Sequence, residues 1–360
     1  MSAEALPPDK RKFVDPKAPA PLRSMGAKGL APMAPPDMIT ALFMLAYDPD
    51  EKIRDTAVAT AAGLADRVLA PALREERVPP LVLGWFLDLF WEKDAYAEML
   101  ILNSGTPDEA VARVASKCGV RTAEIVAGNQ LRLLRHEDIV RQLALNPSTE
   151  GALIDGVCDF SVRSGLVLAD VPQMKAARVR LYGPEAAEAP PDPGPTADSV
   201  IAELGVGEES SAPMEEGKRL TLSQRIMKMN IAEKIKLATK GNKEARSILI
   251  RDSNKLVAVA VIRSPRITDG EVLMQANNKT AQEEILRIIC ADREWTKMYP
   301  VKLALVRNPK VPQAIGMRFL STLRETDVKN LARDRNVPNV IQMTARKMVA
   351  KKDEPKKEEK

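Results

Sequence analysis

A local phrase that ends one helix and begins another recurs along this chain of 360 residues. It joins an apolar helix end, an Asn, Asp or Ser, one to three polar or proline residues, and a new apolar period. Asn and Asp favour turns and can cap a following helix, while a residue that precedes proline avoids the helical region. The phrase therefore predicts short helices of about 8–14 residues, joined by loops of about 2–5 residues. It occurs at 45–53, 100–111, 143–154, 237–249, 249–259, 261–273, 273–286, 303–315 and 331–341.

Between these phrases the apolar residues recur at helical spacing, as Ile315, Phe319 and Leu323 do at intervals of four. The apolar run KLVAVAVI at 255–262 also suits a buried strand. We predict a helix there, because the same phrase flanks the run and no second strand of comparable quality lies near it. Short helices cannot bury an apolar face alone, so the sequence predicts an all-α fold of two stacked arrays, an α-solenoid of the HEAT-like kind.

The amino-acid composition favours many small helix–helix interfaces over one large hydrophobic core. Hydrophobic residues make up 45% of the chain but aromatic residues only 4%, so Leu, Ile, Val, Ala and Met must build the interior. No apolar run is long enough to cross a membrane, and the N-terminus lacks the apolar core of a signal peptide. The three cysteines are scattered and odd in number, which favours unpaired buried thiols and a cytoplasmic location.

Two segments rich in proline divide the chain. Residues 1–36 hold eight prolines, and residues 183–217 hold six prolines and nine acidic residues with no Lys or Arg. Such compositions predict disorder. Within the second segment, DSVIAELG at 198–205 is either plain linker or a transient helix or docking peptide. The expected domains are a disordered arm at 1–36, a helical-repeat domain at 37–182, a disordered acidic linker at 183–217, a basic helical-repeat domain at 218–350 and a charged, disordered tail at 351–360.

The net charge of +5 conceals a strong asymmetry between the blocks. Residues 1–182 have a net charge of −2 and the linker has −9, whereas residues 218–350 have +15 and the tail +1. The high positive charge of residues 218–350 is a signal that any functional interpretation has to explain.

The segment LALVRNPKVPQAIGMRFL at 303–320 resembles bacterial HEAT-like helical repeats, particularly the leucine-rich-repeat-variant style. The longer run at 234–348 resembles a domain that recurs in bacterial proteins without an assigned activity. Residues 37–182 match these repeats only in style, with irregular repeat length. The resemblance implies a helical-repeat fold and no particular chemistry.

We find no residue set that amounts to an active site. His136 is the only histidine, and its neighbours Glu137 and Asp138 favour a surface or capping role. Isolated cysteines cannot form a cysteine-based zinc site, and neither a phosphate-binding loop nor a nucleophile elbow occurs. We therefore expect a protein that is not an enzyme and uses no cofactor or metal.

The basic block leaves several interpretations open. The first is a non-catalytic scaffold or adaptor that binds a protein partner, acidic partners included, through its repeat surfaces. The alternative is sequence-nonspecific binding of nucleic-acid phosphates. An enzyme, such as one that acts on DNA bases or attaches chromophores, is a further interpretation. Lys and Arg side chains that merely solvate the helical surface are another. Clusters such as Arg251-Asp252 and Arg333-Asp334 are interpreted first as helix-end motifs and second as a row of arginines along one ridge. The residues predicted to contact a partner are Arg246, Arg251, Lys255, Arg263, Arg266, Arg293, Lys302, Arg307, Lys310, Arg333 and Arg335.

Overall fold

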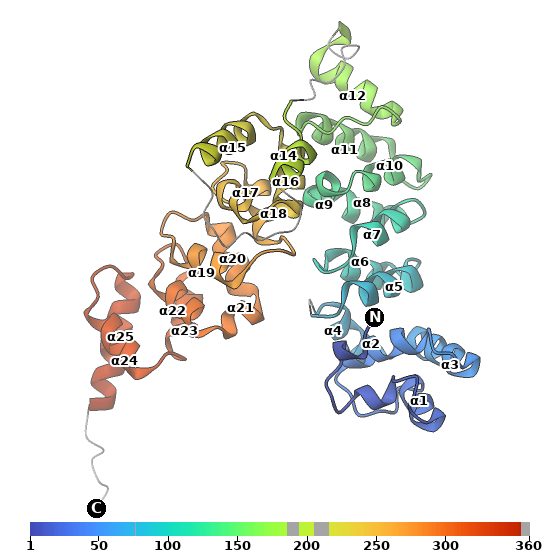
Figure 1. The fold of residues 1–360 in the computed structure, drawn as a ribbon, viewed down its shortest axis with the longest axis horizontal. Helices are drawn as coiled ribbons and strands as arrows, with labels where there is room; N and C mark the ends of the chain where they lie inside the picture. Colours follow the sequence, from blue (N-terminus) through green and yellow to red (C-terminus); the bar gives the residue numbers. More distant parts are fainter. Residues whose placement is uncertain (76, 186–193, 205–215, 354–360) are drawn as a thin grey trace, which may run out of the picture. The chain divides into compact units, whose positions relative to one another are not determined.

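The computed structural model describes residues 1–75, 77–185, 194–204 and 216–353. These residues form short helices joined by tight loops, with no β-strand among them. The chain divides into two compact units, residues 1–192 and 193–360, which we call unit 1 and unit 2 (Figure 1). The predicted all-α repeat fold is confirmed, and KLVAVAVI forms helix α18 (Lys255–Ile262) rather than a strand.

Unit 1 stacks its helices in two rows (Figure 1). In one row α2 packs on α4, α4 on α6 and α6 on α8, while in the other α5 packs on α7 and α7 on α10. The helices are α1 (Ala20–Ala27), α2 (Pro35–Leu45), α3 (Glu51–Ala62), α4 (Asp66–Leu73), α5 (Pro80–Phe90), α6 (Asp94–Leu102), α7 (Asp108–Ala115), α8 (Val120–Gly128), α9 (Gln130–Arg135), α10 (Asp138–Leu145), α11 (Gly151–Arg163) and α12 (Pro172–Tyr182).

Unit 2 repeats the same plan. Helices α15 and α17 pack together, as do α19 and α22, and the alternate helices α16, α18 and α20 pack in sequence. Its helices are α14 (Ala197–Leu204), α15 (Glu216–Lys228), α16 (Ile231–Lys240), α17 (Lys243–Leu249), α18, α19 (Asp269–Asn277), α20 (Glu283–Ala291), α21 (Arg293–Lys297), α22 (Tyr299–Arg307), α23 (Gln313–Leu320), α24 (Glu325–Arg333) and α25 (Asn339–Asp353).

The prediction of a disordered arm at residues 1–36 is wrong. This segment forms two short 3-10 turns and α1, which packs against α2 and α3. Leu6 and Phe13 are buried, and a side chain at Gly26 would lie only 2.8 Å from the Phe13 carbonyl oxygen. The prolines start elements here instead of preventing them, since Pro35 occupies the first position of α2, where its fixed φ suits a helix. Unit 1 therefore begins well before residue 37.

The predicted linker at 183–217 is also partly ordered. Residues 194–204 include α14, which packs against α16 of unit 2. Ala197 and Val200 are fully buried in this contact, and the Ala197 backbone amide donates to Glu233 Oε2 at 2.7 Å. The described part of DSVIAELG thus contributes to a docked helix, because Val200 is buried against unit 2. Residues 186–193 and 205–215 of the linker, and 354–360 of the tail, lie outside the described residues.

The recurring phrase of the sequence is a repeated side-chain turn. In each of seven copies, Oδ1 of the Asn or Asp accepts a hydrogen bond of 2.8–3.0 Å from the backbone amide two residues later. None of these residues has a positive φ. The side chain therefore terminates one helix and directs the chain into the next without backbone strain. The seven residues are Asp48, Asn103, Asn146, Asp252, Asn278, Asn308 and Asp334.

Three of these asparagines also bind the preceding repeat. Asn308 Nδ2 donates to the carbonyl oxygens of Ala276 and Asn278, both at 3.0 Å. Asn103 and Asn146 are likewise buried and donate to carbonyl oxygens about 30 residues earlier in the chain. Each buried amide thus adds hydrogen bonds to carbonyl oxygens at the helix ends and loops of the preceding repeat. The asparagines fix the register between neighbouring repeats.

At two of the three copies that carry Asp, a cation from an earlier helix pairs with the carboxylate. Arg23 Nη1 donates to Asp48 Oδ1, and Lys234 Nζ lies 2.8 Å from Asp252 Oδ2. A carboxylate has no hydrogen to donate, so it needs a donor or a cation when it is shielded from water. At Asp48 and Asp252 the carboxylate thus suits the cation that the earlier helix presents.

Candidate partner-binding surfaces

In unit 2, the loops that follow α17, α19, α22 and α24 form one edge of the array. They comprise residues 250–254, 278–282, 308–312 and 334–338, and we call them, with the helix ends beside them, the loop edge. Gln282 Nε2 donates to the Asp252 carbonyl oxygen at 2.8 Å, and Lys310 Nζ donates to the Ala281 carbonyl oxygen at 3.1 Å. These bonds join consecutive loops side by side.

The last loop belongs to the same edge by helix geometry. The N-cap of α24 lies beside the first residue of α22, where the Arg324 backbone amide donates to the Tyr299 hydroxyl at 3.1 Å. Each helix has nine residues, and from this equal length and shared starting point we infer that their last residues, Arg307 and Arg333, belong to the same edge. The loop edge therefore extends over four successive repeats.

The structure divides the eleven predicted contact residues into groups. Those on the loop edge are Arg251, Lys255, Arg307, Lys310, Arg333 and Arg335. Arg263, Arg266 and Arg293 follow α18 and α20 and lie at the opposite edge, where Arg266 donates to the Lys240 carbonyl oxygen at 3.1 Å. Lys302 is half-buried within α22. The sequence prediction omitted Lys279, which is exposed on the loop edge.

The prediction that Arg246 contacts a partner is wrong. Its side chain is 1% exposed and forms two hydrogen bonds to the Glu271 carboxylate, at 2.9 and 3.0 Å. Burial raises the pKa of Glu271, but hydrogen bonds from Arg246 and Thr268 outweigh that effect, so the pKa lies below its usual value. Glu271 is also the third residue of a capping box with Thr268. This pair holds α17 against the start of α19 and is part of the interior.

Cations on the loop edge differ from those of unit 1 in their pairing. In unit 1, several exposed arginines are paired with carboxylates, as Arg113 is with Asp88 and Arg121 is with Glu98. In the described part of the chain, no carboxylate lies within ion-pair distance of the seven loop-edge cations. We call these seven the cationic row. They are Arg251, Lys255, Lys279, Arg307, Lys310, Arg333 and Arg335.

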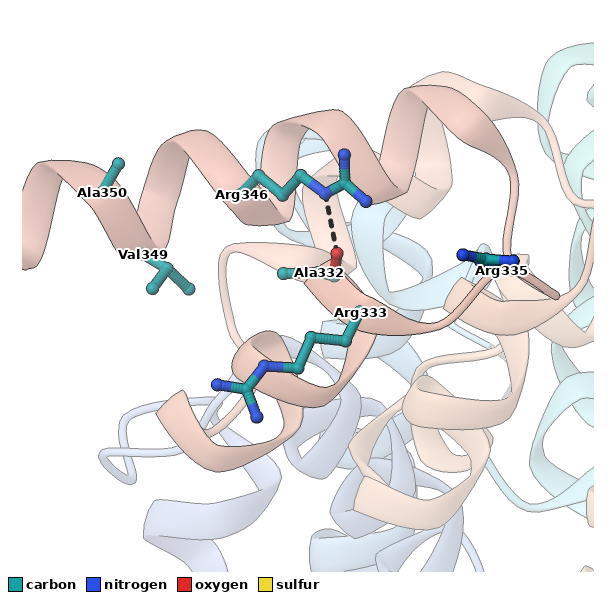
Figure 2. Close-up of a pocket in the computed structure, with 6 residues that line it drawn as sticks. All are labelled: Ala332, Arg333, Arg335, Arg346, Val349 and Ala350. Carbon is teal, nitrogen blue, oxygen red and sulfur yellow. Dashed lines mark hydrogen bonds between the residues drawn. The ribbon is translucent and has the colours of Figure 1, made fainter.

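Positive charge is densest at the end of the cationic row that includes Arg307 and the arginines beside α25. Arg307 is half-buried, and its Nε is shielded from water without a hydrogen-bond acceptor among the described residues. Arg333, Arg335 and Arg346 surround an open depression of about 540 Å³ between α24 and α25 (Figure 2). Arg346 Nε donates to the Ala332 carbonyl oxygen at 2.8 Å. The three side chains border the depression without converging on one point (Figure 2).

Unit 1 carries a groove of a different character. It has a volume of about 590 Å³ and crosses α4, α6 and the start of α8. Its floor includes Met99 and Leu102 of α6, and Leu102 is 62% exposed. Charged residues form its rim, with Arg74 at one side and the ion pair between Arg121 and Glu98 at the other. An apolar floor with a polar rim is the usual arrangement of a protein interface.

The residue just before the turn Asn or Asp is exposed in six of the seven copies. In unit 1 it is Tyr47, Leu102 or Leu145, with exposures of 66%, 62% and 72%. In unit 2 the same position holds Arg251, Asn277, Arg307 and Arg333, of which Arg307 is half-buried. The repeats thus share a backbone plan while presenting apolar side chains in one unit and mainly arginines in the other.

The three cysteines are unpaired and buried, and burial raises the pKa of Cys118, Cys158 and Cys290 to about 11. We expect fewer than one thiol per chain to react with iodoacetamide at about pH 8 in the native protein, because the thiolate is the reactive form. All three should react in urea. Mass spectrometry of the alkylated chain measures this, and rapid native labelling of any one cysteine would contradict it.

His136 lies at the end of α9, with Nε2 at 3.9 Å from Asp138 Oδ2. Within the described ranges, no group of three or more His, Cys, Asp or Glu side chains is placed to hold a metal ion. None of the helices in those ranges is long and apolar enough to cross a membrane. No family model, no curated protein and no solved structure matches this chain.

Proposed function

We propose that this protein is a non-catalytic scaffold or adaptor that binds a protein partner through the surfaces of its helical repeats. The observation that carries the proposal is the groove across α4, α6 and α8, in which Met99 and Leu102 form an apolar floor beside charged rim residues. A large apolar side chain exposed on a rigid helix is characteristic of a docking site when a groove surrounds it. The three buried, unpaired thiols favour a reducing compartment such as the cytoplasm.

A photo-crosslinking amino acid at position 102 tests this proposal. We expect it to form covalent protein adducts of discrete mass in cells, because the groove brings a partner within reach. The same amino acid at Leu81 is the matched control, since Leu81 is 60% exposed but lies on α5, in the other row. Adding Arg74→Glu to the position-102 variant should reduce adduct yield at least threefold. Equal adducts at positions 81 and 102, or none at position 102, would contradict a docking role for the groove.

A second candidate function is sequence-nonspecific nucleic-acid binding by unit 2, and the cationic row is the observation that favours it. It concerns other residues than the groove, so each function can fail without the other.

A further inference from the structure

We propose that the cationic row binds the phosphate backbone of a double-stranded nucleic acid, with Arg251, Arg307 and Arg333 as its repeating contacts. The inference rests on the second candidate function and assigns it to one edge of unit 2. The first observation is which arginines form ion pairs with carboxylates. Arginines that stabilise the fold are paired here, as Arg246 is with Glu271, whereas the row has no ion-pair partner in the described part of the chain.

The spacing of the row suits an extended polyanion. Packed helices lie roughly 8–10 Å apart, so four successive repeats place these cations along roughly 25–30 Å. A B-form duplex completes one turn in about 34 Å and carries one phosphate charge per about 1.7 Å of axis. Cations at each repeat can therefore meet phosphates along one side of the duplex. The separated guanidinium groups around the depression beside α25 also suit a chain of phosphates better than one small anion (Figure 2).

The composition of the loop edge favours nucleic acid over an acidic protein. Protein interfaces need apolar or aromatic anchors at their centre. Among the exposed large apolar side chains of unit 2 in the described residues, Val340 lies beside the loop edge, while Met274 and Met343 lie about one helical turn from it. Trp295 lies on α21, Tyr299 lies at the opposite end of α22, and Phe319 is buried. Without aromatic side chains on this edge, stacking on single-stranded bases is not expected.

Four carboxylates also belong to the loop edge and reduce its net positive charge. Asp252 and Asp334 are occupied by their turns, and Asp252 is further paired with Lys234. Glu283 and Glu284 are exposed in the first turn of α20. They lie beside the row and should repel phosphates, which provides a variant expected to strengthen binding. The opposite edge has exposed cations too, but Asp269, Asp292 and Glu294 are interspersed with them.

The test is a salt titration of the full-length protein with a DNA duplex of mixed sequence, about three helical turns long. If the seven cations of the row contact phosphates, the logarithm of the association constant should fall with the logarithm of salt concentration with a slope of about −6. The variant R251Q/K279Q/R333Q/R335Q should weaken binding at least tenfold and reduce that slope by about 3–4. All four side chains are exposed, so we expect no loss of folding.

Two variants make the result specific to this edge. K240Q/K243Q/R263Q/R293Q removes the same charge from exposed side chains of the opposite edge and should change the slope by less than about 1. E283Q/E284Q should tighten binding at least twofold, which a purely structural role of these residues would not produce. Equal effects of the two quadruple variants would refute the assignment to the loop edge, even if nucleic-acid binding itself were retained.

Binding of duplex RNA, single-stranded DNA and polyglutamate distinguishes a nucleic-acid ligand from an acidic protein partner. A duplex RNA of equal length should bind within about tenfold of duplex DNA, because the contacts are to phosphates, and the corresponding single strand should bind more weakly. Absence of duplex binding at about 50 mM salt would overturn both the inference and the second candidate function. Polyglutamate of equal charge that displaces the duplex at equal concentration would overturn the inference in favour of an acidic protein partner.

Discussion

Replacing Glu271 with Gln should lower the free energy of unfolding of unit 2 by about 3–5 kcal/mol, because it leaves the Arg246 guanidinium buried without a counter-charge. The double variant R246M/E271Q should be less destabilised than E271Q alone, since the buried charge is then gone while the introduced amide can still accept from Thr268. Urea denaturation followed through Trp295 fluorescence, with Trp85 and Trp91 replaced by Phe, measures both values. A double variant less stable than the single one would contradict this account.

The same pair predicts the direction of a pH dependence. The pKa of Glu271 is lowered from its ordinary value of 4.5 in the folded protein. Its contribution to stability is therefore complete above about pH 4.5 and is lost as pH falls through the folded pKa. The wild type should lose more stability than E271Q on acidification below that point. The exposed pair of Glu325 and Lys329 is the control, since E325Q should cost less than about 1 kcal/mol.

Replacing Asn308 with Asp should destabilise unit 2 by a comparable amount, about 3–5 kcal/mol at neutral pH. The substitution changes only an amide into a carboxylate. It removes both hydrogen bonds donated to Ala276 and Asn278, and it places a negative charge against those carbonyl oxygens in a site that is 2% exposed. The loss should shrink as pH is lowered, because protonation removes the charge. Urea denaturation between about pH 4 and neutrality, in the same tryptophan background, measures it.

Asn254→Asp is the matched control for this substitution. Asn254 is the N-cap of α18, where its side chain accepts from the Leu256 backbone amide. Asp serves equally well as an N-cap, so the cost should stay below about 0.5 kcal/mol. If both Asn→Asp changes cost the same, the buried amide of Asn308 does not join the repeats as described.

The turn phrase predicted the helical fold well, because termination of a helix is a local event. An Asn or Asp followed by proline or polar residues specifies where one helix ends, whatever surrounds it. The prediction that KLVAVAVI forms a helix succeeded for the same reason. Composition was a poorer guide to order: the proline-rich start of the chain and the DSVIAELG segment fold because Phe13 and Val200 find apolar partners elsewhere in the chain.

For the candidate surfaces, the sequence provided the charge but not its distribution. The excess of Lys and Arg after residue 217 was evident from counting. Arg246 and Arg251 look equivalent in the sequence, yet one is buried against Glu271 and the other is exposed without an ion-pair partner among the described residues. The groove beside Leu102 had no local signal at all, because its walls come from α4, α6 and α8. One signal could have been used: the residue before the turn Asn or Asp is exposed in six of the seven copies.

The sequence by itself thus determined the short helices, the turns between them and the basic character of the second unit, since each depends on neighbouring residues or on composition. Only the tertiary structure decided which cations remain available to a ligand. Whether an arginine is neutralised depends on a carboxylate 25 residues away, as Glu271 is from Arg246, and packing of one repeat on the next sets that distance.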